Sequence, residues 1–147
     1  MSRNYSRSAE KRMRELADDA STAFESTVLH NRVHEQVAGQ HNRDNHLIRL
    51  LDLAERSYDL ADEYETDRTV SSEVFAAAER LNDQVDALVN ESIARACATI
   101  VTESQDWDDV HDPEDLQEAR YEARAWLQQH QTAAERAGVW EEVTAHA

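Results

Sequence analysis

The chain has 147 residues, and its 31 Asp and Glu against 15 Lys and Arg give a formal net charge of −16. Two glycines and one proline leave little material for turns, and the single cysteine excludes an intramolecular disulfide framework. No run of residues approaches the apolar length needed to cross a bilayer, and the N-terminal residues lack the apolar core of a signal peptide. We therefore expect a cytoplasmic helical protein with a single domain over residues 1–147, of which residues 1–8 form a basic arm.

The first predicted helix begins at a serine cap near its N-terminus, runs to Val37 and ends at Gly39. Apolar and small residues alternate at steps of four and three along this range, which is the spacing of a bundle seam. The seam is weak, because His30 and His34 occupy positions where leucine or isoleucine usually stands. The short polar connection that follows, residues 40–45, favours an antiparallel neighbour.

The second predicted helix starts at a cap on Asn42 or Asp44 and runs to about Glu65. Rows of acidic residues along this helix and the next one are interpreted as solvated faces. The expected buried face of the second helix consists of Leu47, Leu50, Leu51, Ala54, Tyr58, Ala61 and Tyr64.

The segment from Ser72 to Ser104 is the most apolar long stretch, and its steps of three and four predict the central helix. The fourth helix begins at an Asp112 cap with Pro113 in its first turn, and it ends at Gly138 before a short C-terminal helix. Four helices with short loops predict an all-α fold. Its expected form is an antiparallel up-down four-helix bundle with long first and third helices.

One end of that bundle would gather histidines and carboxylates. His30 and His34 lie one turn apart on the inward seam, a spacing that can chelate a single ion. Imidazoles with carboxylates suit Zn, Mn or Fe. The candidate ligands are His30, His34, His41 and His111. The alternative is that these histidines are structural, since the helix dipole favours histidine near C-termini. The inward Glu-x-x-His pairs of di-metal bundles are also missing, so we expect a protein without a cofactor.

Arg124 and His130 are the candidate catalytic pair. Their spacing fits the Arg-x(4–6)-His motif of the HEPN ribonuclease family, which is likewise a small helical bundle. The resemblance covers these two residues and implies ribonuclease activity. Ala125 stands where that family usually has a polar residue.

The acid excess, with Lys11 as the only lysine, favours a salt-adapted protein, since molar salt screens the self-repulsion of an acidic surface. A GC-rich genome would explain arginine in place of lysine but not the acid excess. Mimicry of nucleic acid by the acidic surface is a further alternative.

The weak, alanine-rich seams favour a binding protein over an enzyme, because small residues let another helix approach closely. We expect an interaction protein that forms a homodimer or serves as a subunit or adaptor of a larger assembly. The expected partner is protein, whether another chain or a second copy, rather than nucleic acid or a membrane, and the sequence identifies no small molecule. The candidate interface anchors are Trp107, Trp126 and Trp140.

Overall fold

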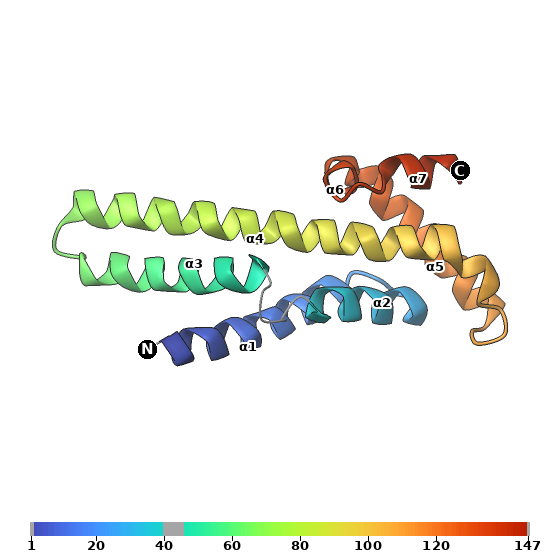
Figure 1. Ribbon diagram of the computed structural model, residues 1–147, viewed down its shortest axis with the longest axis horizontal. Coiled ribbons are helices and arrows are strands. Elements are labelled where there is room, and N and C mark those ends of the chain that lie inside the picture. The colour runs from blue at the N-terminus through green and yellow to red at the C-terminus, as the bar shows by residue number, and fades with distance from the viewer. Residues whose placement is uncertain (1, 40–45, 147) are drawn as a thin grey trace. The chain divides into compact units, whose positions relative to one another are not determined.

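The computed structural model describes residues 2–39 and 46–146, and within these ranges the chain is all helical, without strands. The all-α prediction is therefore confirmed. The helices are α1 (Ser2–Ser21), α2 (Thr27–Ala38), α3 (His46–Glu63), α4 (Arg68–Glu103), the 3-10 helix η2 (Ser104–Asp106), α5 (Pro113–Gln129), α6 (Gln131–Arg136) and α7 (Trp140–Ala145), shown in Figure 1.

The chain forms two compact units. The first, which we call the hairpin unit, contains Met1–Glu15 and Gln40–Leu88. The second, which we call the C-terminal unit, contains Leu16–Gly39 and Val89–Ala147. The helix predicted over Ser72–Ser104 is found as α4, whose 36 residues begin in the first unit and end in the second. Among the helices of residues 2–39 and 46–146, none combines the length and the apolar character that crossing a membrane requires.

In the hairpin unit, α3 and the first half of α4 lie side by side and antiparallel (Figure 1). The hydroxyl of Ser71 donates a hydrogen bond to the carbonyl of Ala61 at 3.0 Å, which ties the two helices together near their connection. The ring of Tyr58 meets that of Phe75 edge-on at 5.4 Å. The buried residues of the pair are Leu47, Leu50, Leu51, Ala54 and Ala61 on α3 and Ala78 and Val85 on α4.

The C-terminal unit is built on the second half of α4, which is buried on most of its sides from Val89 to Val101. In the same unit α2 packs against α5, and α5, α6 and α7 pack on one another in sequence. The buried residues of these two helices are Val28, Leu29, Val33 and Val37 on α2 and Leu116, Ala119, Ala123 and Leu127 on α5.

The prediction of one long first helix is wrong, because the helix is broken between Ser21 and Thr27. The hydroxyls of Ser21 and Thr22 donate to the carbonyls of Asp18 and Asp19, so these side chains compete for the backbone groups of the last turn. Ser26 then starts a new helix as its N-cap, and its hydroxyl accepts the Leu29 N–H at 3.4 Å. The predicted end of this segment at Gly39 is confirmed, since Gly39 is the C-cap of α2.

The start of the predicted fourth helix is confirmed, with Asp112 as N-cap of α5 and Pro113 in its first turn. The helix is interrupted at His130, whose φ of −125° and ψ of 45° leave the helical region, so the prediction of a continuous helix to Gly138 is wrong. Gly138 does end α6, at a φ of +76°. Its N–H donates to the Glu135 carbonyl and the Val139 N–H to the Ala134 carbonyl, which is the Schellman pattern. The predicted short C-terminal helix is α7.

Candidate interaction surface

His30 and His34, the predicted chelating pair, connect α2 to the end of α1. His30 Nδ1 lies 2.8 Å from the carbonyl oxygen of Ser21, and because a carbonyl only accepts, Nδ1 carries the proton of this bond. His34 Nε2 lies 2.8 Å from Asp18 Oδ1. In one straight helix these partners would be about 13 Å and 24 Å apart at a rise of 1.5 Å per residue. Both contacts therefore depend on the break after Ser21.

The other predicted metal ligands are placed differently. His41 lies outside the described residues. The ring of His111 lies 6.1 Å from that of Trp107, between η2 and α5. Within residues 2–39 and 46–146, no three His, Cys, Asp or Glu side chains are arranged to hold a metal ion. Binding of Zn, Mn or Fe by the histidines stays an alternative that the structure does not test.

Arg124 and His130, the predicted catalytic pair, both belong to the α5 segment, and His130 is its C-cap. The His130 ring stacks on Trp126, with centroids 4.0 Å apart and planes 11° from parallel. Its Nδ1–H donates to the Trp126 carbonyl at 2.9 Å. The structure thus gives His130 a role in ending α5.

The three tryptophans predicted as interface anchors are all half-buried. The guanidinium of Arg32 lies over the ring of Trp107, 4.7 Å from its centroid. The ring of Trp126 stacks on that of His130. Trp140 lines a hollow of about 320 Å³ together with Glu135, Gly138 and Glu141. Their role in an interface stays a prediction.

Two carboxylates of α5 accept hydrogen bonds from the N-terminus of α2 and the residues just before it. Glu122 Oε2 accepts the N–H of Glu25 at 2.9 Å, and its Oε1 accepts the N–H of Ser26 at 2.7 Å. Asp115 accepts the Ser26 hydroxyl at 3.1 Å and the Val28 N–H at 3.3 Å. Carboxylates at this position satisfy donors that a helix leaves unpaired and match the positive end of its dipole. The sequence alone does not reveal this cluster, because its members are about 90 residues apart along the chain.

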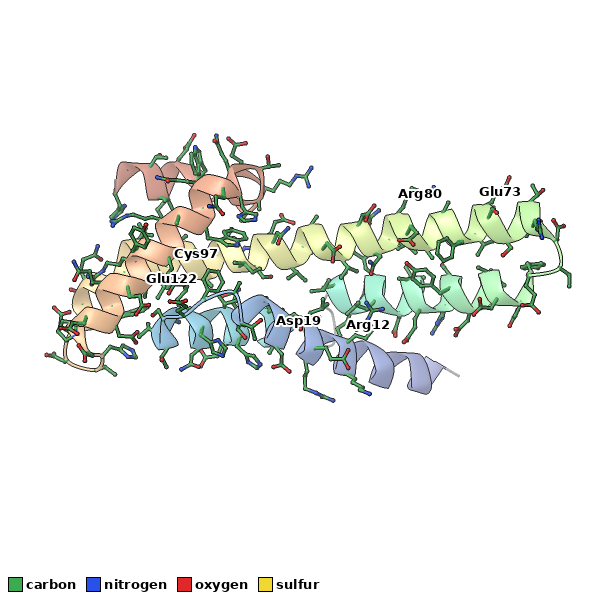
Figure 2. The ribbon with its side chains drawn as sticks, turned by 180° about the vertical axis from the view of Figure 1, so that it is seen from behind. Arg12, Asp19, Glu73, Arg80, Cys97 and Glu122 are labelled. Carbon is green, nitrogen blue, oxygen red and sulfur yellow. The ribbon has the colours of Figure 1, made fainter. Side chains whose placement is uncertain are left out.

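Cys97, in the second half of α4, is completely buried. Burial, and next the charge of Glu122, raise the pKa of its thiol far above the ordinary value (Figure 2). A thiol kept protonated in this way is a poor nucleophile. Cys97 thus acts as a small buried hydrophobe of α4.

A stripe of large apolar side chains is exposed on α3 and on the turn residue that follows it. Leu53, Leu60 and Tyr64 are 49%, 41% and 45% exposed. At 100° per residue they fall within about 40° of one another around the helix, and their centre lies about 100° from that of the buried residues. Tyr64 was predicted to be buried with the others, and this is wrong. The α3 helix therefore has two apolar stripes, and its pairing with α4 covers one.

The adjoining surface of α4 is also apolar. The contact between Tyr58 of α3 and Phe75 of α4 marks one face of this antiparallel pair. At 100° per residue, a set of apolar α4 residues then lies on the opposite face. Together with the α3 stripe they form what we call the apolar hairpin face. Its members are Leu53, Leu60 and Tyr64, which are exposed, and Val70, Val74, Leu81 and Leu88, which are half-buried.

The other face of the pair, with Tyr58 and Phe75, is acidic. Partial burial, and next the charge of Asp83, raise the pKa of Asp86, while Arg12 of α1 lowers it. Partial burial and Glu79 raise the pKa of Tyr58, and Arg12 again acts in the opposite direction. Arg12 (Figure 2) therefore lies near this acidic face and finds opposite charge within its own unit.

No protein-family model, no curated protein and no solved structure matches this chain.

Proposed function

We propose that this protein acts by binding other helices, as a salt-adapted, cytoplasmic, homodimeric interaction protein. The observation that carries the proposal is the apolar hairpin face. Leucine and tyrosine side chains that are nearly half exposed and aligned along one helix form a contiguous patch, and such patches mark protein–protein interfaces. A helix that meets another helix through one stripe and keeps a second stripe of leucines in water has a second partner to bind.

The polar composition of the rest of the chain sharpens this argument. The net charge of −16 and the acidic face around Asp86 keep most of the surface hydrated. Exposure of an apolar face to water is unfavourable in free energy, and contact with a partner removes that face from water. The predicted antiparallel up-down four-helix arrangement can be completed between two copies, each of which supplies the α3–α4 pair.

The acid excess supports the salt-adapted part of the proposal. Two chains of the same charge repel when they associate, and ions at molar concentration limit the range of this repulsion to a few ångströms. Self-association should therefore strengthen as KCl rises from millimolar to molar.

Sedimentation equilibrium tests the proposal. We expect wild-type protein in molar KCl to have twice the chain mass of 16.8 kDa. Leu60→Glu places a charge in the centre of the apolar hairpin face and should return the protein to the chain mass. Tyr121→Glu is the matched control, because Tyr121 is 76% exposed but lies on α5 in the C-terminal unit, and this variant should remain dimeric. Wild-type protein at the chain mass at every concentration would contradict the proposal.

A further inference from the structure

We infer that the occupant of the apolar hairpin face is the same face of a second copy, related by a two-fold axis perpendicular to the helices. The two α3–α4 pairs then form a four-helix bundle in which α3 packs antiparallel on α3 and α4 on α4. This inference rests on the proposed function and adds the partner, the register and the orientation of the contact.

The size of the face fits this occupant. The α3 helix has 18 residues, which is about 27 Å at 1.5 Å per residue. Two helices about 10 Å apart make a face about 20 Å wide. Two such faces cover about 1,100 Å², which exceeds the roughly 1,000 Å² that a specific interface requires. A single helix from another protein would cover less than the full width.

The register follows from the hairpin itself. The Tyr58–Phe75 contact shows that these positions of α3 and α4 are at the same level. An axis that crosses the face at this level, close to Ser57, brings Leu53 opposite Leu60 and Tyr64 of the second copy. The same axis brings Val70 opposite Leu81. Apolar residues therefore meet apolar residues along both helices with one choice of axis.

The charges on the edge of α4 agree with that axis. Glu73 and Arg80 lie on the edge of α4 that points away from α3 (Figure 2). Seven residues separate them, about 10 Å along the helix, so they are too far apart to pair within one chain. The axis near Ser57 places Glu73 of each copy opposite Arg80 of the other. On α3 the same axis passes one residue from Arg56, so Arg56 of one copy faces Arg56 of the other, and Glu63 is level with Leu51. Like contacts are avoided only on the α4 edge.

The alternative two-fold arrangement has its axis parallel to the helices and packs α3 on α4 of the second copy. It would bring Arg80 between Arg49 and Arg56, and Glu73 beside Glu63. Like charges opposed at an interface are destabilising and select against that arrangement. The distribution of charge thus favours the perpendicular axis.

Disulfide cross-linking tests the geometry directly. Ser57 is half-buried and lies next to the proposed axis, so in a Ser57→Cys variant the two introduced thiols meet across it. We expect a covalent dimer under mild oxidation, observed on a non-reducing gel. Ser72→Cys is the control, since Ser72 is exposed on the other face of the hairpin and should give no covalent dimer. The native Cys97 is completely buried and contributes no background.

A charge exchange provides an independent readout. Arg80→Glu and Glu73→Arg should each weaken the dimer about three- to tenfold, because each creates two like-charge contacts across the axis. The double variant Glu73→Arg/Arg80→Glu restores opposite charges and should recover wild-type affinity. The measurement belongs at the lowest KCl concentration that keeps the protein folded, since salt screens exposed pairs.

The outcomes separate this inference from the proposed function. A wild-type dimer in which Ser57→Cys fails to cross-link, or in which Ser72→Cys cross-links as readily, overturns the geometry and leaves the interaction function standing. Failure of the double variant to regain affinity overturns the pairing of Glu73 with Arg80. A monomeric wild-type protein overturns both proposals.

Discussion

Replacement of Glu122 by alanine should be among the most damaging single changes on the surface of the C-terminal unit. The carboxylate accepts the backbone N–H groups of Glu25 and Ser26 at 2.9 and 2.7 Å. Hydrogen bonds to a charged group contribute about 1.5–3 kcal/mol, and a buried donor left without a partner costs about 1–3 kcal/mol. Glu25 is exposed and its N–H returns to water, whereas Ser26 is completely buried.

The loss should therefore come mainly from Ser26. We expect Glu122→Ala to lower the free energy of unfolding by about 2–3 kcal/mol. Glu122→Gln keeps one oxygen that can accept the Ser26 N–H, and it should cost about half as much. Glu118 is exposed one turn earlier on the same helix, so Glu118→Ala serves as the matched control and should stay within about 0.5 kcal/mol of wild type.

Urea unfolding in molar KCl, followed by far-ultraviolet circular dichroism, measures these differences. The high salt is held constant so that removal of one acid from an acidic protein contributes little through general repulsion. If Glu122→Ala unfolds at the same urea concentration as Glu118→Ala, the carboxylate does not support the N-terminus of α2 and the argument fails.

Two further predictions concern Cys97 and the glycines. The folded protein keeps the Cys97 thiol protonated above its ordinary pKa of 9.0, so above pH 9 it binds more protons than the unfolded chain. The free energy of unfolding should therefore fall as pH rises above about 9, by up to about 1.4 kcal/mol per pH unit. A Cys97→Ala variant should lose this dependence in pH-dependent urea unfolding, and an unchanged dependence would refute the assignment. Gly138→Ala should cost about 1–2 kcal/mol because φ is +76° there, whereas Gly39→Ala should be neutral or stabilising because φ is −63°. Neither glycine has an atom within 4 Å of an added Cβ, so equal effects on the thermal unfolding midpoint would exclude backbone strain as the cause.

The elements that could be predicted from sequence are those set by local chemistry. The apolar period of α4, the Asp112–Pro113 start of α5 and the glycine stop at Gly138 each depend on a few neighbouring residues, and each is found in the structure. Such signals need no knowledge of the rest of the fold. They account for the all-α class and for most of the helix bounds.

The break after Ser21 shows why the remainder was missed. The four-three alternation continues through residues 9–37 because α1 and α2 each bury one face, so the period alone does not reveal that the chain turns between them. The signal that was available is the pair Ser21–Thr22 followed by Ser26, since these residues favour caps over helix interiors. Because of this break, His30 hydrogen-bonds to the Ser21 carbonyl instead of packing in the predicted seam.

The apolar hairpin face was missed for a different reason. Leu53 and Leu60 are seven residues apart, and Tyr64 follows four later, so a second helical period was present in the sequence beside the first. The predicted buried face follows the first stripe and leaves out Leu53 and Leu60, although a helix of the predicted four-helix bundle has more than one neighbour. A helix with two apolar stripes about 100° apart is typical of a bundle with more than one neighbour.

The two units differ in how completely the chain covers its own apolar surface, and the proposed dimer contact lies in the less covered unit. The second half of α4 is buried on most sides from Val89 to Val101, whereas in the first half only Ala78 and Val85 are buried and Val74, Leu81 and Leu88 remain half-exposed. The hairpin unit, which consists of α3, the first half of α4 and the first part of α1, buries few large apolar side chains to offset its ordering entropy. In the proposed dimer a second copy covers the apolar hairpin face, so folding of the hairpin unit and dimerisation should be linked by mass action. In the proposed dimer, the apolar side chains of the second half of α4 are covered within the chain, and those of the first half are covered by the second copy.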